Sequence, residues 1–192
     1  MIIQKALVTG GAGFVGTNLI KRLLHDGYTV TSVDNYSTGK VENHLDGCEY
    51  LDYDIRDIDF KLYLKPDVVF HLAATARIQP SFKDPKKYFT TNANGTLNVT
   101  DYCANNKIPL IYAGSSSHHS GKFSNPYTFS KDIGEEVVKL YQDQFGLKAS
   151  TARFYNVYGT YQLTEGGYTT LIGKWLNNIK KGSPCDIFGD GE

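Results

Sequence analysis

The sequence has little of several features whose presence would mark particular classes of protein. Its 192 residues include one methionine, one tryptophan and three cysteines, and the formal net charge at pH 7 is zero. A neutral balance gives no electrostatic reason to expect a nucleic acid or an acidic membrane as partner. No apolar run approaches about 18 residues, and the opening stretch MIIQKALVTGG lacks the basic and apolar segments of a signal peptide. We therefore expect a soluble, cytoplasmic protein.

The cysteines argue against both a disulfide framework and a metal site. Cys48, Cys103 and Cys185 are odd in number, widely spaced and outside any metal-ligand pattern. We expect three reduced, buried thiols, as in a reducing compartment, and no bound metal.

Short apolar runs alternate with helical patterns along the chain. The runs are KALVTG (5–10), YTVTSVD (28–34), CEYLDYD (48–54), PDVVFHLAA (66–74), IPLIYAG (108–114) and KASTARF (148–154). Strands that alternate with helices in this way indicate a parallel sheet covered on both faces. The predicted fold is therefore α/β, a Rossmann-type doubly wound parallel sheet with helices on both faces.

Three helices are expected between these strands, each with an apolar side. One covers 14–27, one roughly 85–105, and one starts at NPYTFSK (125–131). Their expected apolar positions are Val15, Leu19 and Leu23; Leu97, Val99 and Tyr102; and Ile133, Val137, Leu140 and Tyr141.

Three glycines carry the first functional signal. In TGGAGFVG (9–16) they follow a strand and open a helix. Gly10 permits a tight turn, Gly13 lets the backbone approach a pyrophosphate, and Gly16 lets the helix pack closely. The helix N-terminus would face the anion. The pattern predicts a dinucleotide-binding turn.

Asp34 ends the second strand, 18 residues after Gly16. A carboxylate there suits hydrogen bonds from an adenosine ribose and repels a 2′-phosphate, so NAD is favoured over NADP. Lys40 is a mild counter-signal, because a flexible lysine could reach a phosphate.

Taken with further motifs, the glycine turn resembles one family. The motifs are DIRD (54–57), HLAA (71–74), NANGT (92–96), YAGSSS (112–117), NPYTFSK (125–131) and RFYNVYG (153–159). In this order and spacing they resemble extended short-chain dehydrogenase/reductases of the NAD-dependent nucleotide-sugar epimerase and dehydratase group. The resemblance covers nearly the whole chain.

The resemblance gives Tyr127 and Lys131 a role. It implies that the tyrosine is the acid/base and that the lysine, one helical turn away, is its helper. A free phenol has a pKa of about 10, and a neighbouring ammonium favours the phenolate. The resemblance also implies a catalytic hydroxyl residue, serine or threonine, after the fifth strand. Ser115 matches best, and Ser116 remains open.

The same segment departs from the family pattern. Where relatives carry a tyrosine-glycine pair, or an acidic residue after the hydroxyl residue, this chain reads SSSHHSG (115–121). The absence of a carboxylate argues against dehydration and decarboxylation. His118 and His119 are polar loop residues, extra proton carriers or sugar contacts, and these alternatives stay open. His71 is expected to be structural.

Other roles are carried over by position. Asn156 would contact the sugar-nucleotide diphosphate, and Asn92 would support the tyrosine region. The full set of expected cofactor contacts is Gly10, Gly13, Phe14, Val15, Gly16, Asp34, Asn35, Ser37, Thr38, Gly39, Asp54, Ile55, Leu72, Ala73, Ala74, Asn92, Tyr127, Lys131 and Tyr155.

The resemblance implies a 4-epimerase that binds NAD and a nucleotide-diphosphate sugar. The alternatives are a 4-ketoreductase or epimerase-reductase of the same fold, and an NAD-binding fragment without turnover. Residues 1–165 would form the NAD-binding domain. Residues 166–192, an amphipathic helix followed by SPCDIFGDGE (183–192), would begin a truncated sugar-nucleotide region. A homodimer through a four-helix interface of helices around 94–105 and 128–145 is implied as well, with Phe129, Val138 and Phe145 as extra apolar residues.

Overall fold

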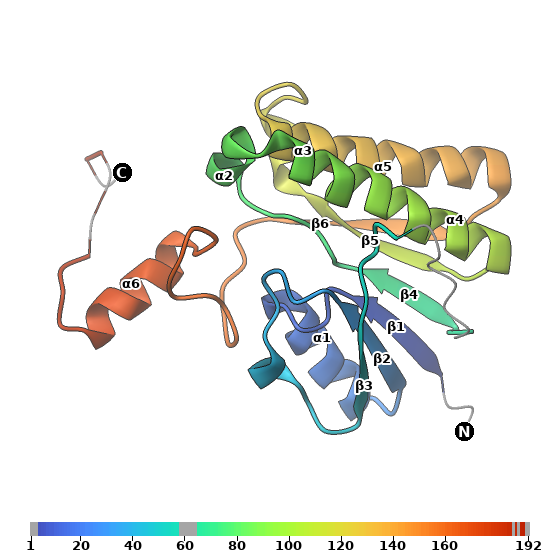
Figure 1. Ribbon diagram of the computed structural model, residues 1–192, viewed down its shortest axis with the longest axis horizontal. Helices are drawn as coiled ribbons and strands as arrows, with labels where there is room; N and C mark the ends of the chain where they lie inside the picture. The colour runs from blue at the N-terminus through green and yellow to red at the C-terminus, as the bar shows by residue number, and fades with distance from the viewer. Residues whose placement is uncertain (1–3, 58–64, 186, 188, 191–192) are drawn as a thin grey trace.

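Six parallel strands form the centre of the molecule (Figure 1). The computed structural model describes residues 4–57, 65–185, 187 and 189–190. The strands are β1 (Lys5–Thr9), β2 (Thr29–Asp34), β3 (Cys48–Asp52), β4 (Val68–His71), β5 (Leu110–Ser115) and β6 (Ala149–Phe154). Their order, β3-β2-β1-β4-β5-β6, is that of the doubly wound dinucleotide-binding fold. The predicted fold is confirmed.

Helices cover the two faces of this sheet. Helix α1 (Phe14–His25) lies on one face, and α4 (Thr96–Asn106) and α5 (Pro126–Phe145) lie side by side on the other (Figure 1). The shorter helices are α2 (Ile78–Lys83), α3 (Pro85–Tyr88), the 3-10 helices η1 (Val41–Asn43) and η3 (Ser116–Ser120), and the π-helical η2 (Phe89–Gly95). Helix α6 (Leu171–Lys180) stands apart from the sheet, at the left of Figure 1.

Side-chain alternation along β1 separates two hydrophobic cores. Because successive strand residues point to opposite faces, Ala6 and Val8 pack with Ile20 of α1, whereas Leu7 packs with Val99 of α4 and Val138 of α5. These side chains are almost fully buried. The sheet is thereby fixed between its two helical layers, and the carboxyl ends of its strands share one edge.

The helix expected over 85–105 is interrupted. Residues Pro85–Asn106 are helical, but their middle, η2, has π-helical geometry, which often accompanies functional sites. Val99 and Tyr102 are buried as predicted, whereas Leu97 is 40% exposed. On α5 the expected core position Leu140 is 52% exposed, and Val138 takes the buried place. In both helices, fewer apolar residues are buried against the sheet than the apolar pattern in the sequence predicts.

Other expectations concern the cysteines and the C-terminal stretch. All three cysteines are free; Cys103 is buried, and Cys48 and Cys185 are half-buried. The strand-like run from Ser183 lies partly outside the described residues, and of those described Cys185 and Ile187 are not in a strand. Among the residues that the structure describes, none of the helices combines the length and apolar character that a bilayer crossing requires.

Candidate active site

A cleft of about 860 Å³ opens at the carboxyl edge of the sheet, where the strand order reverses between β1 and β4. This is the usual ligand position in open α/β sheets. Most predicted site residues line it: Gly10, Gly13, Phe14, Val15, Gly16, Asp34, Asn35, Ser37, Thr38, Ile55, Leu72, Ala73, Ala74, Ser115, Ser116, Tyr127, Lys131, Tyr155 and Asn156. The lining does not include the predicted residues Gly39, Asp54 and Asn92.

The glycine turn has the backbone geometry that a dinucleotide requires. Gly10 has a φ of 75°, which strains any L-residue, and its N–H donates to the Val33 carbonyl at 2.7 Å. A Cβ on Gly16 would collide with the Gly10 carbonyl, so α1 can pack here only on a glycine. A Cβ on Gly13 would meet only that carbonyl, at 3.3 Å, and would otherwise occupy the cleft. Backbone N–H groups at the start of α1 therefore border open space.

Asp34 fixes the loop that follows β2. Its carboxylate accepts from the Ala12 N–H at 3.0 Å and from the Tyr36 N–H at 2.9 Å. Gly39 closes over it, and a Cβ there would lie 2.9 Å from both carboxylate oxygens. Burial raises the pKa of Asp34 above its ordinary value, although the two N–H bonds oppose this. Asp34 thus joins the glycine turn to the loop and still faces the cleft.

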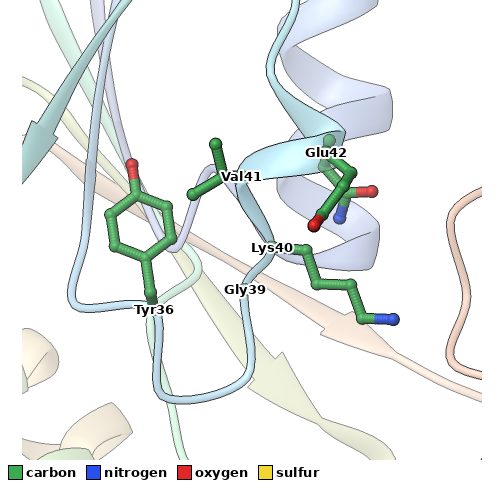
Figure 2. A pocket seen from close by; sticks show the side chains of 6 residues that line it. Tyr36, Gly39, Lys40, Val41 and Glu42 are labelled. Carbon is green, nitrogen blue, oxygen red and sulfur yellow. The ribbon is translucent and has the colours of Figure 1, made fainter.

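Lys40 belongs to a second, smaller hollow of about 530 Å³, lined by Tyr36 and residues 39–43. Figure 2 shows its side chain on the opposite side of this loop from Tyr36. Lys40 does not line the main cleft. The one sequence signal that favoured NADP therefore lies outside the cleft.

Asp54 is engaged by its neighbours. It accepts hydrogen bonds from Asn35 Nδ2 at 2.8 Å and from the Arg56 guanidinium at 2.6 Å. Arg56 holds the pKa of Asp54 down at about 2. Asp54 thus orders the loop that carries Ile55, which lines the cleft, and its contact with a cofactor stays a prediction.

Tyr127 and Ser115 meet directly in the cleft. The tyrosine hydroxyl donates to Ser115 Oγ at 3.2 Å, and Ser115 Oγ is 2.9 Å from Ser117 Oγ. Helix α5 places Tyr127 because Asn125 caps its first turn, accepting from the Thr128 N–H at 2.8 Å. Ser116 lines the cleft, but the hydroxyl that accepts the hydrogen bond from Tyr127 is that of Ser115. Of the two serines left open by the sequence, the geometry favours Ser115.

Lys131 lies one turn further along α5 and is only 5% exposed. Its Nζ sits 4.4 Å from the centre of the Tyr112 ring, a cation–π contact from β5. Burial lowers the pKa of Lys131 to about 7, and Glu135 partly opposes this. A lysine in this state can exchange a proton near neutral pH, which few lysines can.

Asn92, in the π-helical η2, connects two parts of the site. Its amide holds Thr75 by two hydrogen bonds, 2.8 Å from the Thr75 N–H and 2.9 Å to the Thr75 carbonyl. It also donates to Ser130 Oγ at 3.0 Å, and Ser130 Oγ donates to the Tyr127 carbonyl at 2.8 Å. Asn92 therefore holds the helix that carries Tyr127, from behind the cleft.

Comparison with known proteins agrees with this geometry. The sequence profile of the NAD dependent epimerase/dehydratase family matches residues 6–192. The chain belongs to this family. It is 31% identical to the UDP-glucose 4-epimerase of Mycolicibacterium smegmatis, over 98% of this chain and 67% of that protein. It is 28% identical to UDP-glucuronic acid decarboxylase 1 of Xenopus tropicalis, over 98% of this chain and 49% of that protein.

A solved structure is similar as well. The Thermus thermophilus UDP-glucose 4-epimerase in complex with NAD matches with a TM-score of 0.84 and 30% identity, over 94% of this chain and 64% of that chain. The chain spans about half to two thirds of the length of the curated relatives it matches.

The histidines that depart from the family's pattern lie beside the cleft and not in its lining. His118 Nδ1 is 3.0 Å from the Asp132 carboxylate, and His119 Nε2 is 3.2 Å from the Tyr155 hydroxyl. His71 is fully buried between two threonine hydroxyls, Thr9 at 2.7 Å and Thr96 at 3.0 Å. Burial lowers the pKa of His71 to about 3, so it is neutral and structural, as expected.

Several cleft residues of this family member were not foreseen. Arg77, after β4, lines the cleft, as do residues 161–163 and 167–170 and Lys174. Tyr112 and Tyr88, which contact Lys131 and Tyr127, were also missed. Tyr112 begins the recognised motif YAGSSS, and Arg77 closely follows HLAA. Their contacts with Lys131 and Tyr168 arise only from the packing of separate segments, which no local pattern in the sequence marks.

Proposed function

We propose that this protein is an NAD-dependent nucleotide-sugar 4-epimerase. The observation that carries the proposal is the hydrogen bond between Tyr127 and Ser115, set beside Lys131 in a cleft that also holds the glycine turn. An acid/base, a hydroxyl to orient the sugar, and a dinucleotide cradle in one cleft are the parts that such a reaction needs. Family membership and the epimerases among its relatives support the same reading.

The cleft fits NAD. The turn at Gly13 and the first N–H groups of α1 would hold the pyrophosphate, and Asp34 would accept hydrogen bonds from the adenosine ribose. Ile55, Ala73 and Tyr155 would line the two ring systems. When bound, NAD supplies a temporary acceptor for the hydride that leaves the sugar carbon and later returns to its other face.

Proton transfer would fall to the residues of α5 and β5. Tyr127, as phenolate, would take the proton from the sugar hydroxyl and later return it. Ser115 would donate to or accept from the same sugar oxygen, since it already contacts Tyr127 at 3.2 Å. Lys131, whose pKa near 7 allows either charge state, would stabilise the phenolate.

Decarboxylation and dehydration are less well supported. The resemblance implies that these reactions use a carboxylate just after the hydroxyl residue, where this chain has Ser117, His118 and His119. A ketoreductase could use histidines as extra acids, but His118 and His119 do not line the cleft and are engaged by Asp132 and Tyr155. These placements favour epimerisation.

The sugar-nucleotide would lie toward the later part of the chain. Tyr155 and Asn156 line the cleft after β6, and residues 167–170 continue this lining. We therefore keep the division in which residues 1–165 bind NAD and residues from 166 onward contribute to the sugar-nucleotide side.

Product analysis tests the proposal. The protein is incubated with NAD and, separately, each member of several 4-epimeric UDP-sugar pairs, and the products are identified by NMR. An epimerase produces each member from the other without net loss of NAD. Consumption of NADH with a keto-sugar as substrate would indicate the reductase instead, and failure to convert any pair would contradict the proposal.

A further inference from the structure

Arg77, which lines the cleft, has an unusual backbone conformation. Its φ is 87° and its ψ 137°, a region where residues other than glycine are rarely found. Such strain persists only where the surrounding structure imposes it, and it concentrates at ligand-binding positions. Glycine adopts this conformation without strain. The presence of arginine at this position therefore indicates that its side chain has a role.

Hydrogen bonds hold the backbone immediately before Arg77. Thr75 is held by both groups of the buried Asn92 amide, and the Tyr88 hydroxyl donates to the Ala76 carbonyl at 2.7 Å. Tyr88 also packs edge-on against the Tyr127 ring, with centroids 6.2 Å apart. Through Tyr88, the backbone next to the strained Arg77 is therefore connected to the end of the cleft that contains Tyr127.

The Arg77 side chain is oriented but not neutralised. Its Nε donates to the Tyr168 carbonyl at 2.9 Å, which leaves the two terminal NH₂ groups for another acceptor. Within the described part of the chain, no carboxylate pairs with Arg77. Asp34 is the single carboxylate among the described residues that line the cleft, and it ends β2, whereas Arg77 follows β4.

Two further donors line the cleft close to Tyr168 in the sequence. The Thr169 hydroxyl is buried without a partner among the described residues, and Thr169 is 8% exposed. Lys174, on the first turns of α6, lines the cleft as well. Two cations and an unpaired hydroxyl thus line one cleft, and the bond from Arg77 to Tyr168 joins the first cation to the segment that carries the hydroxyl. Guanidinium, ammonium and hydroxyl groups are the donors that bind oxyanions.

We propose that Arg77, with Thr169 and Lys174, binds an oxyanion of the sugar-nucleotide substrate. The inference rests on the proposed function and deepens it. The oxyanion is either a phosphate of the diphosphate or a carboxylate on the sugar, and a guanidinium fork binds both in the same bidentate way.

Calorimetry with three probes separates these sources. UDP carries only the diphosphate, UDP-glucose adds a neutral sugar, and UDP-glucuronate adds a carboxylate. If Arg77 binds phosphate, Arg77→Gln weakens binding of all three by roughly 10- to 100-fold, as expected for a lost charged hydrogen bond. If it binds the carboxylate, only UDP-glucuronate loses affinity. Unchanged affinity for all three would overturn the inference.

Two further variants act as controls. Arg22→Gln removes one positive charge from an exposed site on α1 and should leave all affinities unchanged. Arg77→Gly removes the same side chain but relieves the strained φ, so affinity should fall while the melting temperature stays the same or rises by up to about 4 °C. A clear fall in melting temperature in Arg77→Gly would make the residue structural and overturn the inference. Absence of nucleotide binding by the unchanged protein would contradict the proposed function too, whereas binding that Arg77→Gln leaves intact contradicts only the inference.

Discussion

The two ends of the cleft are built in different ways. At the Asp34 end, the cleft is formed mainly by backbone groups of one short segment, Gly10–Gly16. Asp34, on the next strand, holds this segment in place by a hydrogen bond. At the Tyr127 end, side chains from β5, α5 and η2 meet across separate stretches of chain, and Arg77 reaches a backbone carbonyl of the loop before α6. One end is a local motif and the other is a product of tertiary packing, so mutations should affect the two ends separately.

The largest separation is expected from Tyr127→Phe. Removal of the hydroxyl takes away the proposed acid/base, and general acid–base groups contribute about 100- to 10,000-fold to turnover. Epimerisation measured by NMR should fall by that factor. NAD affinity measured by calorimetry should change little, because the glycine turn and Asp34 are untouched. Loss of NAD binding together with turnover would show that the two ends are not independent.

Lys131→Met should reduce turnover by about 100-fold, and it has a second effect that can be measured without substrate. The pKa of Lys131 is lowered to about 7 in the folded protein, whereas a lysine in the unfolded chain titrates near pH 10.4. Between these two pH values the unfolded state binds a proton that the folded state does not, so stability rises with pH across this window. Below about pH 7 both states carry the proton, and the cost of burying the ammonium is complete.

Urea unfolding at pH 6, 8 and 10 measures this effect. Lys131→Met should be more stable than the unchanged protein at pH 6, by up to a few kcal/mol, and the difference should shrink as the pH approaches 10. Tyr112→Phe serves as a control variant in the same unfolding measurements, because it keeps both Lys131 and the aromatic ring that contacts it. A pH-independent difference between Lys131→Met and the unchanged protein would mean that the lysine titrates normally.

The contrast between the two ends also explains how far the sequence could be read. The alternation of strands and helices, the glycine turn, Asp34 and the spacing of Tyr127 and Lys131 are local patterns. The structure has the parallel sheet that the alternation predicted, and it brings the glycine turn, Asp34, Tyr127 and Lys131 into one cleft. The burial of Leu97 and Leu140 was predicted wrongly, because apolar spacing on a helix does not tell which side meets the sheet. Arg77 and Tyr112 were missed, because their contacts join segments that are far apart in sequence.

Asp34→Ala should act at the other end of the cleft. Loss of the carboxylate removes its repulsion of a 2′-phosphate, so the preference for NAD over NADP should fall on the order of tenfold in calorimetry. The Ala12 and Tyr36 N–H groups also lose their acceptor, which should lower stability by about 1–3 kcal/mol.

Asp34→Asn separates these two consequences. It removes the charge but retains one carbonyl acceptor, so the preference should relax with a smaller loss of stability. If the unchanged protein already binds NADP as tightly as NAD, the assignment of Asp34 to the ribose is wrong.

The smallest effect on activity is expected at the surface of α4 and α5. The resemblance to epimerases implies a homodimer through these helices, and Leu97, Leu140 and Phe145 are exposed there, at 40%, 52% and 63%. Val138, expected at the interface, is buried in the chain's own core, and Phe129 packs between Phe89 and Phe123. We therefore predict that Leu140 is the interface position most sensitive to charge.

Light scattering at micromolar concentration compares Leu140→Asp with Ile179→Asp, a change at an apolar residue of α6 that is 65% exposed. The unchanged protein and Ile179→Asp should scatter as dimers, and Leu140→Asp as a monomer, because a desolvated carboxylate opposes helix packing between subunits. Turnover per chain should change little, since Leu140 does not line the cleft. If the unchanged protein scatters as a monomer, the prediction of a homodimer is wrong. If only Ile179→Asp is a monomer, the interface between subunits involves α6, which also carries Lys174 of the proposed oxyanion site. Dimer formation would then be coupled to substrate binding and not to the helix that carries Tyr127.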